Sequence, residues 1–288
     1  MTIYHSPRGR EALQSVYADA VDRLDVDVTT HTVDTNFGST HVLLTGPVDG
    51  EPVLVFQGGN STNPLTLSMY TDLATTYRLI APDTIGHPGY SAETRVDPLS
   101  DAFGRWVVEL LDCFDIESAR MIGTSYGAGI LLRTAAYDPN RIIRGALVVP
   151  AGFGTGSLPA LMRIGIPSIL YRYLPSNRLL DAVIEEIVTQ PNADRIVRET
   201  IAASLRHVKL ERKFPGASAA ELAEFDAPVA LFMAEHDPFF PPDTVLPEAS
   251  RRLPNLAHAE VLRGESHVLS RNAQKRVTAS IEAFFSAP

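Results

Sequence analysis

Nearly continuous apolar runs alternate with helical patterns along most of the chain, and this alternation limits the possible folds more than any other feature. The runs are Pro52–Phe56, Tyr77–Ala81, Ile142–Val149 and Pro228–Met233, and segments such as residues 64–75 between them have helical spacing. Continuous apolar runs of this length are typical of strands that are buried on both faces. Strands of this kind, separated by helices, form a parallel sheet covered on both sides. The sequence therefore predicts an α/β fold.

Two segments near the N-terminus follow a different pattern, in which apolar and polar residues alternate. They are residues 26–33 and 40–44, separated by Asn36-Phe37-Gly38. Alternation on either side of a turn sequence is typical of two antiparallel strands. We therefore expect a hairpin before the parallel strands.

Residues 151–225 have helical patterns and no strand pattern. An insertion of this size between two sheet strands is typical of a lid. We expect a core made of residues 1–150 and 226–288, with residues 151–225 as an inserted helical lid. The apolar residues of its first helix either pack the lid onto the core or line a pocket. The residues expected to contact a substrate are Leu161, Met162 and Ile166 of the lid, with Phe239 of the core.

The stretch Gly123-Thr124-Ser125-Tyr126-Gly127 lies between a strand pattern and a helical pattern. In that context G-x-S-x-G is typical of a serine on a sharp turn that exposes its hydroxyl. Glycines are needed because the residues two before and two after the serine pass too close together for a Cβ atom. The helix directs its first N–H groups at the serine, so we expect the Tyr126 amide to donate to an oxyanion.

A second amide for the oxyanion is predicted directly after the strand that ends at Phe56. There the sequence reads Gln57-Gly58-Gly59-Asn60. A glycine pair at this end of a central strand lets backbone N–H groups turn inward. We expect the Gly59 amide to donate, with Asn60 as the alternative. A simple turn is the competing interpretation of the same residues.

A serine is a weak nucleophile unless a base and an orienting acid are near it. Asp237 follows the last long apolar strand, and His267 follows a short strand at residues 260–262. The carboxyl ends of parallel strands meet at one edge of a sheet, where open α/β sheets bind ligands. We therefore expect Ser125, Asp237 and His267 to converge there. Their order along the chain is that of the α/β-hydrolases.

Each of these assignments has an alternative. Asp237 also fits a helix cap or a turn, and its neighbours Glu235 and His236 are rivals by residue type. His267 also fits a cap of the last helix. His87 is a further histidine, but it precedes the serine and lies in a segment rich in turn residues, so we do not expect it to be the base.

Together these motifs resemble the α/β-hydrolase superfamily over nearly the whole chain. FGSTHVLLTGP, PDTIGHPGYS, GTSYGAG, EHDPF and GESH resemble bacterial carboxylesterases that have a lid. The resemblance implies a mostly parallel eight-stranded sheet with helices on both faces and an inserted helical lid. Two positions depart from the family pattern. Gln57 stands where the family usually has a histidine, and Ala128 replaces the second glycine of S-x-G-G.

The predicted reaction is hydrolysis of a small, largely apolar carboxylic ester through an acyl-enzyme. His267 takes the proton of Ser125, the amides of Gly59 and Tyr126 hold the oxyanion, and Asp237 orients the imidazole. A lactonase, a carbon–carbon bond hydrolase and an acyltransferase share this machinery and remain open. A non-catalytic binding protein is a more distant alternative. A dinucleotide site at the glycines of the serine turn is opposed by its place after the middle strands.

Composition narrows the possible partners. A net charge of −9 argues against nucleic acid and against anionic membrane surfaces. The single cysteine, Cys113, excludes an intramolecular disulfide and a metal–thiolate cluster, and we expect no cofactor and no metal. The N-terminus has no apolar signal region, and no run of about twenty apolar residues occurs, so we expect a cytoplasmic protein. The oligomeric state is not predicted.

Overall fold

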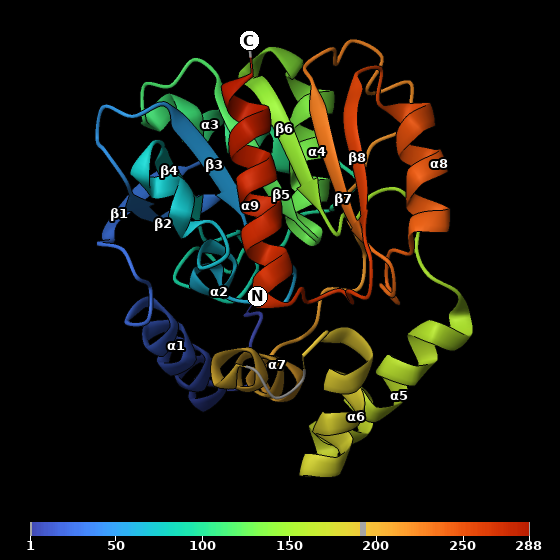
Figure 1. Cartoon of the computed structure of the whole chain (residues 1–288). Coiled ribbons are helices and arrows are strands. Elements are labelled where there is room, and N and C mark those ends of the chain that lie inside the picture. The colour runs from blue at the N-terminus through green and yellow to red at the C-terminus, as the bar shows by residue number, and fades with distance from the viewer. Residues whose placement is uncertain (1, 191–193, 288) are drawn as a thin grey trace.

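The computed structural model describes residues 2–190 and 194–287, and its centre is one eight-stranded sheet (Figure 1). The strand order is β1-β2-β4-β3-β5-β6-β7-β8. The strands are β1 (Thr29–Thr35), β2 (Gly38–Thr45), β3 (Pro52–Phe56), β4 (Arg78–Pro82), β5 (Ala119–Thr124), β6 (Ile142–Val148), β7 (Val229–Ala234) and β8 (Leu256–Leu262). β2 pairs antiparallel with β1 and β4, and the other strands pair in parallel. The predicted fold, with its N-terminal hairpin, is confirmed.

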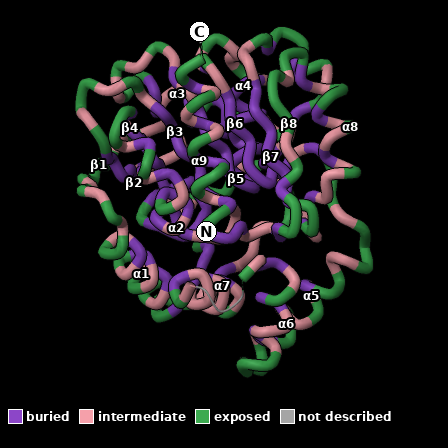
Figure 2. The backbone as a smooth tube through the Cα atoms, viewed as in Figure 1, coloured by how far each residue is buried: buried purple, intermediate pink, exposed green. Residues whose placement is uncertain are grey.

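Helices cover both faces of the sheet. Alternate side chains of each central strand point to opposite faces, and apolar side chains on both faces pack against helices. In β3, Leu54 and Phe56 pack in one cluster, and Val53 and Val55 in the other. The first cluster contains α3 (Ala102–Cys113), α4 (Tyr126–Tyr137) and α8 (Pro242–Arg252); the second contains α2 (Asn63–Leu67), the short 3₁₀ helix η1 (Thr71–Thr75) and α9 (Arg271–Ser286). Figure 2 shows the buried strands between these layers. The continuous helix expected over residues 64–75 is instead two short helices, α2 and η1.

In the described part of the chain between β6 and β7 lie the helices α5 (Leu158–Tyr173), α6 (Asn177–Ile187) and α7 (Arg195–His207). We call residues 151–225 the cap segment; positions 191–193 of it lie outside the described residues. The three helices have an apolar cluster of their own, which includes Ile164, Leu180 and Val183. Figure 1 shows them grouped away from the main body of the sheet. The division of the chain into core and lid stays a prediction.

The N-terminal helix α1 (Pro7–Val21) packs on α7, which the sequence did not indicate (Figure 1). Tyr4 and Val208 form an antiparallel bridge, and the His5 N–H donates to the His207 carbonyl at 2.8 Å. The start of the chain thus contacts the cap segment where α7 ends. Among the described helices, none is long and apolar enough to cross a membrane.

Candidate active site

Ser125 occupies a strained turn between β5 and α4. Its φ of 53° lies in the left-handed region, which a residue with a Cβ rarely adopts. The Ser125 N–H donates to the Val148 carbonyl at 2.9 Å, which ties the turn to the end of β6. A Cβ at Gly123 would lie 2.5 Å from the Ala128 Cα, and one at Gly127 would collide with the carbonyl of Phe56. Both glycines of the motif are therefore required by the tight packing of the backbone.

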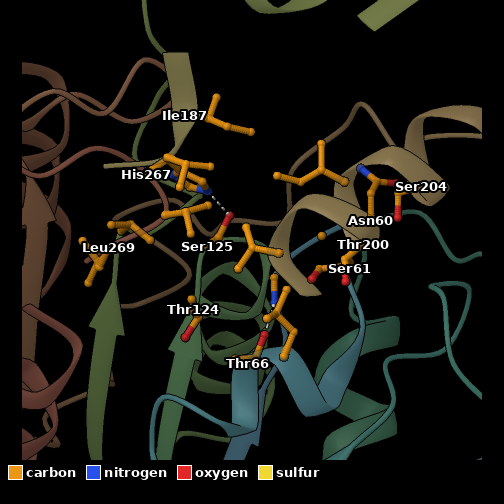
Figure 3. Close-up of a pocket in the computed structure, with 18 of the residues that line it drawn as sticks. Asn60, Ser61, Thr66, Thr124, Ser125, Ile187, Thr200, Ser204, His267 and Leu269 are labelled. Atoms are coloured by element: carbon orange, nitrogen blue, oxygen red, sulfur yellow. Dashed lines mark hydrogen bonds between the residues drawn. The ribbon is translucent and has the colours of Figure 1, made fainter. Parts of the chain in front are cut away.

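The structure brings together Ser125, Asp237 and His267, which follow β5, β7 and β8. The His267 Nε2 lies 3.0 Å from the Ser125 Oγ (Figure 3). The His267 Nδ1 lies 2.7 Å from the Asp237 Oδ2. Since the carboxylate is an acceptor, Nδ1 donates to it. Nε2 is then free to accept the serine hydroxyl proton. This is the arrangement that activates a serine for nucleophilic attack.

Asp237 is fixed by a second set of hydrogen bonds. Its side chain is fully buried, and its Oδ1 accepts the N–H groups of Phe239 at 2.8 Å and Phe240 at 3.1 Å. The other oxygen is thereby left for the histidine. The rivals Glu235 and His236 have exposed side chains, and Glu235 accepts the N–H of Gly264.

The imidazole of His267 is held on two aromatic rings. The ring centroid of Phe239 lies 4.9 Å away at an interplanar angle of 73°, and that of Phe240 lies 5.6 Å away. Only 13% of the His267 side chain is exposed. The ring is consequently restrained by packing as well as by its hydrogen bonds.

Gly59 and Tyr126 lie side by side next to the serine. A Cβ at Gly59 would lie 3.0 Å from the Tyr126 Cβ. Tyr126 is the first residue of α4, so its N–H has no acceptor inside the helix. The Gly58 N–H donates to the Thr66 Oγ1 at 3.3 Å, whereas within the described chain the Gly59 N–H has no hydrogen-bond partner. Of the glycine pair, Gly59 therefore has the amide that is free to bind an oxyanion.

A cavity of about 730 Å³ opens above Ser125 and His267. Gly59 and Thr124 contribute to its floor, and its walls come largely from apolar side chains of α5, α6 and α7. Figure 3 shows Ile187 at the end of α6 beside the Ser125–His267 pair. The reactive groups are thus at the bottom of a mostly apolar pocket that the cap segment covers.

Similarity to known proteins identifies the family of the chain. A family model described as the alpha/beta hydrolase family matches residues 58–279. The chain belongs to the alpha/beta hydrolase family. This hydrolase is 24% identical over 275 residues to the "uncharacterized carboxylesterase nap" of Bacillus subtilis, with 88% of this chain and 86% of the relative covered. It is also 24% identical over 269 residues to carboxylesterase YbfK of the same organism, with the same coverage.

The fold of the hydrolase is similar to that of a crystal structure of naproxen esterase (carboxylesterase NP) from Bacillus subtilis. The TM-score is 0.84 and the identity 21%, and the match covers 98% of this chain and all of that one. The resemblance to bacterial carboxylesterases is therefore confirmed at the level of family and fold.

Of the four residues expected to contact a substrate, two line the pocket and two do not. Leu161 and Phe239 line the cavity. Met162 and Ile166 do not line it, and they are 48% and 50% exposed, so the structure does not bring these two residues to the pocket. The cavity-facing stripe of α5 follows the helical repeat from Leu161 through Ile164, Gly165, Ser168 and Ile169. Met162 and Ile166 each lie two positions from Ile164, which places them on nearly the opposite side of the helix.

Other parts of the pocket wall were not identified from the sequence. They include Ile184, Ile187 and Val188 of α6 and its C-terminal end, and Val197 and Ile201 of α7. The apolar spacing of these helices indicates a buried face. It does not indicate whether that face meets the core, another cap helix or a cavity.

Gln57 has a definite structural role in this hydrolase. It is fully buried, and its Nε2 donates to the Ser61 carbonyl at 2.8 Å. Its Oε1 accepts the Thr84 N–H at 3.2 Å. One amide side chain thus joins the loop of Gly59 to the loop after β4, which requires a donor and an acceptor at once.

His87 lies in the core and contacts Tyr126 rather than Ser125. The two ring centroids are 4.5 Å apart. Burial lowers the pKa of His87 to about 4, so it is neutral near pH 7. Burial also raises the pKa of the Tyr126 phenol. His87 therefore supports the helix that carries the Tyr126 amide.

Proposed function

We propose that this hydrolase is a carboxylesterase that cleaves a small, largely apolar carboxylic ester through an acyl-enzyme. The observation that carries the proposal is the hydrogen-bonded series from Asp237 through His267 to Ser125. It lies at the bottom of an apolar cavity, beside the amides of Gly59 and Tyr126. The relatives named as carboxylesterases support the same reaction class.

In the proposed mechanism, His267 removes the proton of the Ser125 hydroxyl as that oxygen attacks the ester carbonyl. The amides of Gly59 and Tyr126 donate to the negative oxygen of the tetrahedral intermediate. The imidazolium then gives its proton to the alcohol that leaves, and water with His267 as base releases the acid. Asp237 keeps the proton of His267 on Nδ1 and stabilises the imidazolium.

The cap segment is proposed to act as the lid of this core and to select the substrate. Its helices contribute most of the apolar wall, and an apolar wall favours hydrocarbon acyl or alcohol groups. A cavity of about 730 Å³ is in the range of small-molecule sites.

Ester hydrolysis by the Ser125→Ala variant tests the proposal. The purified protein is assayed with p-nitrophenyl esters of increasing acyl length, with lactones, and with an added alcohol that detects acyl transfer. We expect ester hydrolysis by the unmodified protein and a loss of at least about 10⁴-fold in kcat in S125A. Ser15→Ala, at an exposed serine of α1, is the matched control and should retain full activity. Undiminished hydrolysis by S125A would refute the proposal.

A further inference from the structure

The segment that follows α6 is bonded directly to the chain on one side of His267. Val188 and Val268 form a parallel bridge outside the main sheet. The Val268 N–H donates to the Ile187 carbonyl at 2.7 Å, and the Thr189 N–H donates to the Val268 carbonyl at 3.0 Å. The residue after the histidine is therefore fixed by backbone hydrogen bonds to the cap segment.

The residue before the histidine is fixed by the same segment. The Ser266 N–H donates to the Thr189 Oγ1 at 2.8 Å, and the Ser266 hydroxyl donates to the Glu186 carbonyl at 3.1 Å. We call residues 186–189 the histidine clamp. His267 is thus held from both sides by a four-residue piece of the cap segment, and two of these residues, Ile187 and Val188, also line the cavity.

A similar contact joins the cap segment to the loop of Gly59. Asn60 has a φ of 55°, in the left-handed region that asparagine tolerates. Its Nδ2 donates to the Glu211 carbonyl at 3.1 Å, and its Oδ1 accepts the Glu211 N–H at 2.8 Å. Both polar atoms of the Asn60 side chain thus attach the cap segment, shortly after α7, directly beside the free amide of Gly59.

From these contacts we propose that Thr189 and Asn60 are positioning residues, through which the cap segment aligns His267 and the Gly59 amide. The proposal rests on the proposed function. The cap segment then has two roles. Its apolar residues contact the substrate, and its polar contacts keep His267 and the loop of Gly59 in position. A cap that moved away at these points would release the histidine from the serine, so substrate entry has to leave both attachments closed.

Thr189→Val tests the histidine clamp, because valine keeps the shape of threonine and removes the oxygen that accepts the Ser266 N–H. We expect kcat for ester hydrolysis to fall about 10- to 100-fold with KM within 2-fold, as a small misplacement of a catalytic group has an effect of this order. Thr189→Ser restores the oxygen and should recover most of the activity. Thr45→Val is the matched control, because the Thr45 hydroxyl donates to the Asp27 carbonyl at 2.8 Å and neither residue lines the cavity.

Asn60→Gly tests the second attachment. Glycine accepts the left-handed backbone of this position, so the loop keeps its conformation and loses only the two bonds to Glu211. We expect a fall of about 10-fold in kcat and weaker inhibition by a trifluoromethyl ketone, whose addition product resembles the tetrahedral intermediate. Inhibition and kcat equal to those of the unmodified protein would overturn this part of the proposal.

Amide hydrogen exchange separates the inference from the proposed function, since it needs no activity. Exchange at residues 266–268 should be faster in T189V than in the unmodified protein, T189S and T45V. Equal exchange and equal kcat in T189V would overturn the clamp. A lowered melting temperature with unchanged kcat and exchange would assign Thr189 a purely structural role and overturn it as well. If the unmodified protein hydrolyses no ester, the proposed function fails, and the exchange data still decide the clamp.

Discussion

The core and the cap segment of this hydrolase are stabilised in different ways. The central strands of the core are buried on both faces, and the reactive serine is set by backbone geometry that leaves no space for a Cβ at Gly123 or Gly127. The helix α5 of the cap segment instead leaves large apolar side chains such as Leu158 and Tyr173 exposed. Polar contacts at Thr189 and Asn60 attach the cap segment next to the site. We infer that the core carries the reactive groups, whereas the cap segment aligns them and selects the substrate. Changes in the core should therefore have the larger effects on activity.

Of three substitutions in the core and the cap segment, Asp237→Asn should have the largest effect. The amide keeps an oxygen for the N–H groups of Phe239 and Phe240, but its NH₂ group then faces His267 and favours the wrong imidazole tautomer. We expect kcat to fall about 10⁴-fold with the fold intact, as measured by ester hydrolysis and thermal unfolding. Glu235→Gln changes a neighbouring exposed carboxylate and should stay within 2-fold. Equal losses in both variants would contradict the role of Asp237.

His87→Gln tests whether His87 stays neutral in the folded protein, as its burial in the core beneath the site implies. The pKa of His87 is lowered to about 4, so between about pH 6.5 and 4 the unfolded chain binds a proton that the folded chain does not. Stability from this neutral histidine is therefore present above about pH 6.5 and is lost as the pH falls toward 4, by up to about 3 kcal/mol. The free energy of unfolding of H87Q, from urea titrations, should fall less than that of the unmodified protein from pH 7 to pH 4. Identical pH dependences would show that His87 titrates normally.

Leu161→Ala should have the smallest effect of the three, because it changes only the apolar wall. We expect kcat/KM for a medium-chain aryl ester to fall roughly 10-fold, mainly through KM, since apolar contacts of this size discriminate by about 1–3 kcal/mol. Met162→Ala is the matched control on the next position of α5 and should stay within 2-fold. A larger loss in M162A than in L161A would reverse the assignment of the cavity-facing side of α5.

Much of the core could be predicted because its signals are local. Continuous apolar runs identified the central strands to within about a residue, and the breaker-rich turn around Ser125 identified the strand-to-helix junction. Edge elements were less clear. The short strand expected at residues 260–262 is β8, which already starts at Leu256 in the structure. The sequence did not reveal its first residues because most of them are exposed and they form no continuous apolar run. Residues 64–75 satisfy helical spacing, but the Ser68 hydroxyl donates to the Leu65 carbonyl where α2 ends.

The positions of site residues that follow strands at the sheet edge could be predicted from the sequence. Contacts between distant segments that support the site could not. Ser125, Asp237 and His267 each follow a strand, so parallel pairing alone brings them to one edge. The contact of Thr189 with Ser266 joins positions 77 residues apart, and that of Asn60 with Glu211 joins positions 151 apart. Such pairs have no pattern in the sequence, because any polar residue in a loop fits them equally well. The face of α5 that meets the cavity depends likewise on packing against α6 and α7.

Trapping the acyl-enzyme tests directly whether Ser125 is the nucleophile. The unmodified protein is mixed with an excess of a p-nitrophenyl ester, quenched in acid within milliseconds, digested and analysed by mass spectrometry. We expect one acyl group per chain, attached to Ser125, and a matching burst of p-nitrophenol. Hydrolysis without an adduct on Ser125, or an adduct on another residue that forms and decays at the turnover rate, would contradict it.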